Sequence, residues 1–92
     1  MGSIIILLSS STSAVRLKEI LQNKGYNAKV IQTPSILAKG GCNYSVKTTG
    51  RALFEAEQTI KIIGLKSRGI YLDTEEEGNA RYRKLSPGEK MT

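Results

Sequence analysis

The chain begins with a nearly continuous apolar run at residues 3–9, centred on Ile4-Ile5-Ile6-Leu7-Leu8 and bounded by serines. A short, uniformly apolar run is typical of a central strand that is buried on both faces. One face would meet helices, whereas the face that carries Ile5 and Leu7 needs another cover. A dimer partner or another protein could supply that cover.

Two later segments have apolar residues spaced three to four positions apart, which predicts amphipathic helices. The first runs from about Thr12 to Lys24, begins after serines suited to capping, and stops at Gly25. The second covers roughly residues 50–63 and stops at Gly64. Segments with strand-like alternation lie at residues 26–32, 44–47 and 68–73.

This order of elements predicts an α+β fold, a single-domain βαββαβ ferredoxin-like sandwich. Its antiparallel sheet would have four strands, with both helices on one face. We assign residues 1–73 to this domain. Residues 74–92 are polar, and we expect them to form a mobile C-terminal tail.

Composition narrows the chemistry that the domain can perform. Fourteen Lys and Arg residues against eight Asp and Glu residues give a net charge of +6, which favours acidic partners. The basic residues are scattered, so they support weak steering better than a dedicated nucleic-acid groove. The chain has one cysteine and no histidine, which argues against an internal disulfide, a zinc site and a Cys–His catalytic pair. We expect no metal, no cofactor, no membrane span and a cytoplasmic location.

The stretch from Thr33 to Asn43 joins the two halves and contains the single cysteine, Cys42. Thr33-Pro34 would end the preceding strand and position the loop, because proline donates no ladder hydrogen bond. Gly40 and Gly41 allow close approach and can form an anion-binding nest of backbone N–H groups around a thiolate. Asn43 tolerates a left-handed turn. Lys39 and Lys47 could add positive charge.

A lone cysteine without histidine is equally compatible with a small, buried hydrophobe. The Gly-rich, Pro-started setting favours an exposed, reactive thiol instead.

On these residues the chain resembles a small bacterial and archaeal family of selenium/sulfur carrier-like proteins. The resemblance covers about Ile4 to Asp73 and rests on the apolar strand, the Ser-bearing turn, the Thr-Pro segment and the loop cysteine. The matching residues are Ile4 to Ser10, Ala14, Leu17, Leu21, Gly25, Thr33-Pro34 and Cys42. Asn43 stands where the family usually has Gly, and Gly40-Gly41 is added before the cysteine. The resemblance implies that Cys42 carries activated sulfur or selenium from a cysteine desulfurase-type donor to an acceptor enzyme.

We therefore expect a carrier rather than a true enzyme, with Cys42 as the nucleophile and Lys39, Gly40, Gly41 and Asn43 supporting the thiolate or persulfide. Two alternatives remain. One is a non-catalytic binding module for RNA or a small regulatory molecule, which fold analogy alone suggests. The other is a thiol redox sensor that uses the same cysteine. A homodimer is compatible with each of them.

Overall fold

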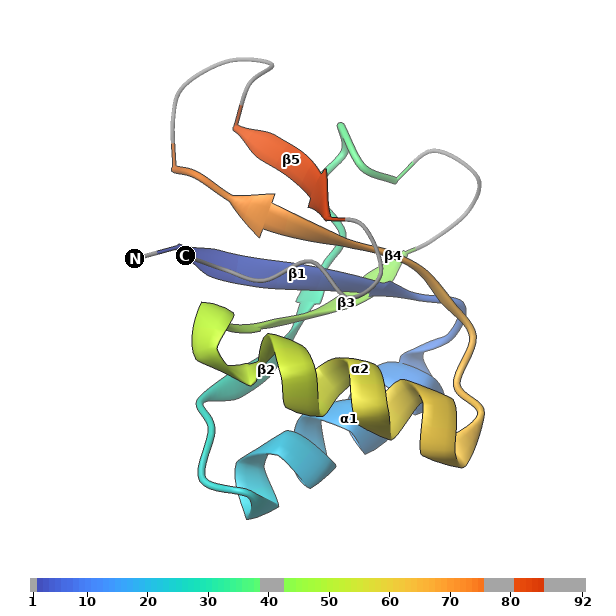
Figure 1. Cartoon of the computed structure of the whole chain (residues 1–92). Coiled ribbons are helices and arrows are strands. Elements are labelled where there is room, and N and C mark those ends of the chain that lie inside the picture. Colours follow the sequence, from blue (N-terminus) through green and yellow to red (C-terminus); the bar gives the residue numbers. More distant parts are fainter. Residues whose placement is uncertain (1, 39–42, 76–80, 86–92) are drawn as a thin grey trace.

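The computed structural model describes residues 2–38, 43–75 and 81–85. Within them the chain forms two α-helices, a short 3-10 helix and five strands (Figure 1). In chain order these are β1 (Ser3–Leu8), α1 (Ser11–Asn23), β2 (Ala28–Gln32), β3 (Tyr44–Thr49), η1 (Gly50–Ala52), α2 (Leu53–Ile63), β4 (Ser67–Asp73) and β5 (Tyr82–Leu85).

The strands form one sheet in the order β2-β3-β1-β4-β5, and each neighbouring pair is antiparallel. Each strand–helix–strand unit is split by a strand of the other unit: β3 lies between β1 and β2, and β1 lies between β3 and β4. The predicted α+β class is confirmed. The prediction of four strands is wrong, because β5 pairs with the outer edge of β4, from Ile70 opposite Leu85 to Asp73 opposite Tyr82.

Strand β1 occupies the centre of the sheet, and Ile4 to Leu8 are all buried. Its side chains alternate between two apolar clusters, as the period of two in a strand requires. Ile4, Ile6 and Leu8 belong to the larger cluster, which includes the buried faces of both helices. Figure 1 shows α1 and α2 together on this side of the sheet. The prediction of a central strand with two buried faces is confirmed.

We call the opposite side of the sheet the open face. There Ile5 and Leu7 are only 1% and 3% exposed. The partly buried side chains packed against them are Ile31, Leu37, Tyr71 and Tyr82. The cover that this face was expected to need therefore comes from other parts of the same chain. A homodimer stays a prediction.

The helices begin and end close to the predicted positions, because a capping serine and two glycines define their ends. Ser10 is the N-cap of α1, and its side chain accepts a hydrogen bond from the Ser13 backbone N–H at 3.2 Å. Gly25 and Gly64 follow the two helices with φ angles of +91° and +72°. Glycine adopts these left-handed angles without the steric cost that other residues have.

Candidate functional site

The central loop, residues 33–43, connects β2 to β3 at one end of the sheet. The structure describes Thr33–Ala38 and Asn43; the predicted site residues Lys39, Gly40, Gly41 and Cys42 lie outside the described residues. What can be described is the frame that holds the two ends of this loop.

A backbone hydrogen bond closes the base of the loop. The last pair of the β2–β3 ladder joins Gln32 and Tyr44. One step beyond it, the Thr33 N–H donates to the Asn43 carbonyl oxygen at 3.0 Å. Asn43 itself is exposed. This contact fixes the position of Asn43, the described residue that comes directly before β3.

A buried side-chain pair lies directly under the same end of the loop. The hydroxyl oxygens of Thr33 and Ser45 are 2.6 Å apart and share a hydrogen bond. Thr33 is 9% exposed and Ser45 is fully buried. A buried hydroxyl without a partner is costly, so each of these residues stabilises the position of the other. Thr33, the first residue after β2, thus anchors the start of the loop.

The first half of the loop folds back over the open face. The Leu37 N–H donates to the Pro34 carbonyl at 2.8 Å, and the Ala38 N–H donates to the Ser35 carbonyl at 3.3 Å. These two bonds form a turn at residues 35–37. It brings Leu37 against the apolar cluster of Ile5 and Leu7. The loop is therefore packed on the sheet through residues just before Lys39.

Lys47, which the sequence suggested as a charge near the thiol, is directed elsewhere. Its Nζ atom lies 3.8 Å from Oδ2 of Asp73. Three residues of strand, about 10 Å, separate Lys47 from Tyr44 at the loop end of β3. Its ammonium group therefore serves a second polar cluster at the far end of the open face.

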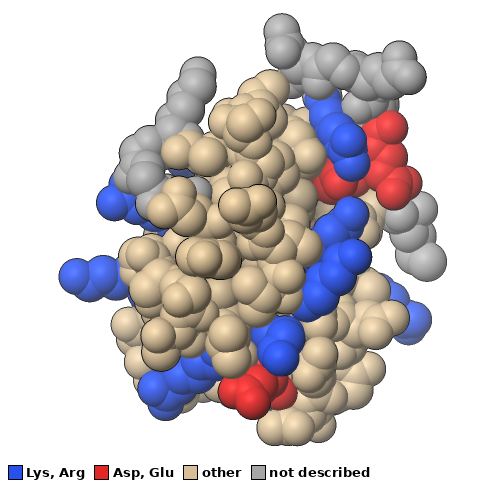
Figure 2. Space-filling model, turned by 180° about the vertical axis from the view of Figure 1, so that it is seen from behind, with Lys and Arg blue, Asp and Glu red and all other residues tan. Residues whose placement is uncertain are grey.

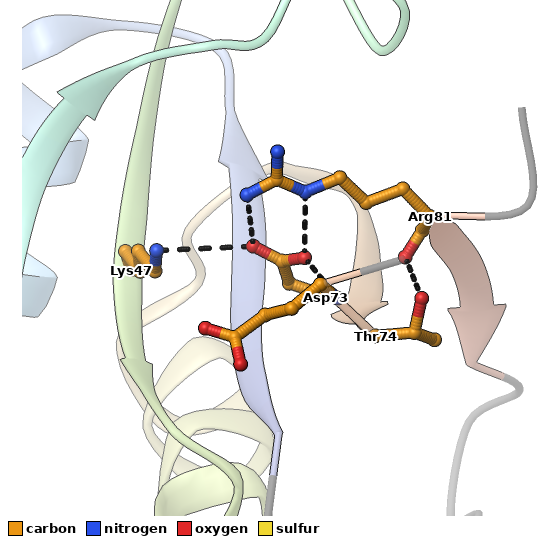
Figure 3. Close-up of polar contacts among 5 residues, drawn as sticks. Lys47, Asp73, Thr74 and Arg81 are labelled. Atoms are coloured by element: carbon orange, nitrogen blue, oxygen red, sulfur yellow. Dashed lines mark hydrogen bonds and ion pairs between the residues drawn. The ribbon is translucent and has the colours of Figure 1, made fainter. Parts of the chain in front are cut away.

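Asp73 is the centre of that second cluster (Figure 3). Its side chain is 1% exposed. Arg81 donates to both carboxylate oxygens, from Nε at 2.9 Å and from a terminal nitrogen at 3.2 Å. The Glu75 backbone N–H donates to the first oxygen at 2.9 Å. Two further bonds, from the N–H and the hydroxyl of Thr74, reach the Arg81 carbonyl at 2.8 Å each.

These contacts determine how Asp73 ionises. The hydrogen bond from Arg81 is the main reason that the pKa of Asp73 is lowered; burial opposes it, and the Glu75 N–H and the positive charges of Arg81 and Lys47 reinforce it. The same bond raises the pKa of Arg81. The arrangement is a fixed ion pair at the base of the β4–β5 connection, since Thr74 and Arg81 flank that connection on its two sides.

This cluster was not among the predicted sites, although its residues carried a signal for it. Asp73 continues an alternating strand onto the face of Tyr71, and a buried carboxylate requires a partner. Gly78-Asn79 is a dipeptide typical of hairpin turns, and it stands between Asp73 and Arg81. A hairpin with Arg81 facing Asp73 could have been predicted from these features.

The part of the chain that the structure describes contains neither a candidate metal-binding cluster nor a candidate membrane-spanning helix. Residues 2–38, 43–75 and 81–85 contain no group of three or more His, Cys, Asp or Glu side chains that could hold a metal ion. Among the same residues, no helix has the length and hydrophobicity needed to cross a membrane.

Comparison with known proteins decides the family. A family model described as "Putative Se/S carrier protein-like" matches residues 3–72. The chain belongs to this family. The match includes β1 to β4 apart from Asp73, both helices and the whole central loop, whereas Arg81 and β5 lie outside it. No curated protein and no solved structure matches the chain.

Proposed function

We propose that this member of the Se/S carrier-like family carries activated sulfur or selenium on Cys42 and passes it to a partner enzyme. The observation that carries the proposal is the family match over residues 3–72, which includes the only cysteine of the chain. A carrier needs a nucleophile but can leave acid–base chemistry to its partners, and a chain without histidine is suited to that role.

The proposed transfer is thiol–persulfide exchange. The Cys42 thiolate attacks the outer sulfur of a donor persulfide, so that a new S–S bond forms and the donor's S–S bond breaks. The donor leaves as a thiolate, and Cys42 becomes a persulfide with no net oxidation or reduction. With selenium as the outer atom the product is a selenosulfide. In the second transfer an acceptor nucleophile takes the outer atom, and the Cys42 thiolate is the leaving group.

The described frame of the loop supports this proposal. The Thr33–Asn43 hydrogen bond joins the two ends of the loop, and Leu37 packs its first half on the sheet, so these described parts are held in place before a partner docks.

We assign supporting roles to the neighbours of the cysteine on the basis of their residue types. Gly40 and Gly41 would offer backbone N–H groups to the thiolate or persulfide, Lys39 would offer charge, and Asn43 would form the turn. The proposed partners are a cysteine desulfurase-type donor and an acceptor enzyme.

Intact-mass spectrometry tests the carrier role. After incubation with a cysteine desulfurase and cysteine, or selenocysteine for the selenium version, the wild-type chain should gain the mass of one sulfur or one selenium atom. A reducing agent should remove that mass. Cys42→Ser, checked for unchanged thermal unfolding, should gain nothing. Equal loading of wild type and Cys42→Ser would refute the proposal.

The pH dependence of Cys42 alkylation separates an activated thiol from an inert one. A carrier thiolate should be alkylated with an apparent pKa below the ordinary cysteine value of about 8.5. A redox sensor would share that property, but it would form a disulfide or a sulfenic acid with peroxide in the absence of any donor. Loading by the donor without such oxidation therefore favours the carrier.

A further inference from the structure

Two lysines stand directly opposite each other on the open face, away from the central loop. The register of β2 and β3 pairs Lys29 with Lys47, and that of β1 and β3 pairs Lys47 with Ile5 of the open face. Side chains at such positions have Cβ atoms about 4.5–5.5 Å apart, and like charges placed there destabilise a sheet. Something must compensate for this pair.

The described residues compensate only one of the two lysines. Lys47 lies 3.8 Å from Asp73, which already takes two hydrogen bonds from Arg81. Lys29 is exposed, and no described residue forms an ion pair with it. Arg81 and Lys47 therefore share Asp73, whereas Lys29 has no acidic partner among the described residues. Figure 2, which views the molecule from behind, shows Lys and Arg side chains gathered in a run with acidic atoms at both its upper and its lower end.

Two hydroxyl groups lie in the adjoining row of the sheet. Ser3 pairs with Thr49, two residues along both strands from the pair of Ile5 and Lys47 and therefore on the same face. Both residues are partly exposed. Among the described residues no hydrogen bond of the Ser3 or Thr49 hydroxyl is found. Both can therefore donate to a ligand.

A surface depression brings these four residues together. Its lining consists of Ser3, Asn27, Ala28, Lys29, Lys47, Thr48 and Thr49, with no acidic side chain among them. Asp73 is not among the lining residues, and its carboxylate forms an ion pair with Arg81. The depression is thus lined by Lys29, by Lys47, whose ammonium group also faces Asp73, and by the hydroxyl-bearing residues Ser3 and Thr49.

We infer that Lys29, Lys47, Ser3 and Thr49 form a binding site for a phosphate-type oxyanion. An oxyanion relieves the repulsion between the two lysines and accepts hydrogen bonds from both hydroxyls, which a neutral or cationic ligand does not do. The site is independent of Cys42 and of sulfur or selenium transfer. The phosphate group belongs either to a small free ion or to an RNA backbone.

A second depression distinguishes these two sources. It shares Asn27 and Thr49 with the first and adds Arg51. A single phosphate fills only the site at Lys29 and Lys47. An RNA strand carries further phosphates, and Arg51 is the charged residue among those that line the second depression.

The site is tested by titrating the full ¹⁵N-labelled chain with inorganic phosphate at constant ionic strength. The backbone amides of Ser3, Lys29, Lys47 and Thr49 should shift and saturate. Lys29→Gln should weaken binding about fivefold, which corresponds to about 1 kcal/mol, the upper end for an exposed ion pair. Lys61→Gln is the matched control, because Lys61 is an exposed lysine on α2. Shifts that do not saturate, or equal weakening by the two variants, would overturn the proposal.

The same titration with a short single-stranded RNA identifies the source. If the ligand is an RNA backbone, RNA displaces phosphate, and Arg51→Gln weakens RNA binding while leaving phosphate binding unchanged. If it is a small ion, RNA fails to displace phosphate, and Arg51→Gln has no effect on either. Both results support the oxyanion site. Displacement of phosphate that is insensitive to Lys29→Gln contradicts it.

Discussion

The buried hydrogen bond between Thr33 and Ser45 gives the sharpest test of how the central loop is anchored. Thr33→Val keeps the shape of the side chain but removes its hydroxyl. Ser45, which is fully buried, then has no partner for its own hydroxyl among the described residues. Leaving a buried polar group unsatisfied costs about 1–3 kcal/mol. For a domain of this size each kcal/mol lowers Tm by about 4–8 °C.

The double variant Thr33→Val/Ser45→Ala distinguishes a lost hydrogen bond from a general loss of packing. Replacing both partners with apolar groups is close to neutral for the hydrogen bond itself. The double variant should therefore be more stable than Thr33→Val alone, with a coupling energy of about 1 kcal/mol or more in a double-mutant cycle. Free energies of unfolding in urea provide the measurement.

Thr12→Val serves as the matched control for this cycle. Thr12 is exposed in the first turn of α1, and no described contact depends on its hydroxyl. Its substitution should change the free energy of unfolding by no more than about 0.5 kcal/mol. If Thr33→Val behaves like Thr12→Val, or if the double variant loses the sum of the two single effects, the hydrogen bond does not anchor the loop.

Two further predictions concern the ion pair and a helix end. The folded state lowers the pKa of Asp73 below 3.8, so its stabilisation is present at neutral pH and is lost as the pH falls through the folded-state value. The difference in unfolding free energy between wild type and Asp73→Asn should therefore close in acid; a difference independent of pH contradicts the role of the charge. Gly64→Ala forces alanine to a φ of +72° and should cost about 1–2 kcal/mol by thermal unfolding. Gly64→Asn should cost less, and equal losses would argue against backbone strain.

The central strand and the helix ends could be predicted because single local features determine them. An uninterrupted apolar run specifies β1, and glycine at a left-handed position stops each helix. The predicted first helix, from about Thr12 to Lys24, differs from α1 by one residue at each end. The second differs more, since Gly50–Ala52 form a 3-10 turn before α2. No side chain caps that turn, and such geometry is not encoded in apolar spacing.

Strand β5 could not be predicted from apolar alternation. Its sequence is Tyr-Arg-Lys-Leu, and its two central residues are exposed and charged. Strand β5 is held in the sheet by contacts with β4: Arg81 forms an ion pair with Asp73, and Leu85 pairs with Ile70. The signals in the sequence were the Gly78-Asn79 dipeptide and the carboxylate of Asp73, and they predict a strand here only when they are considered together.

The same limit applies to the central loop and to the open face. The end of β2 at Gln32 followed from the proline two residues later, because that rule is local. The anchoring of Thr33 by Ser45 depends on register across twelve residues. The cover of Ile5 and Leu7 by Leu37, Tyr71 and Tyr82 depends on the packing of three separate segments. Such contacts are properties of the folded chain and not of any short stretch.

The two edges of the sheet limit how copies of this protein can meet. A free strand edge invites pairing with another chain, and lysine on an edge strand discourages it. Here one edge is β2, with Lys29 at its second position, and the other is β5, with Arg83 and Lys84 at its centre. Continuing the sheet from one molecule into the next would bring basic side chains together at either edge. The order of the strands thus protects the protein against edge-to-edge aggregation, and it directs any specific assembly to the helices or to the open face.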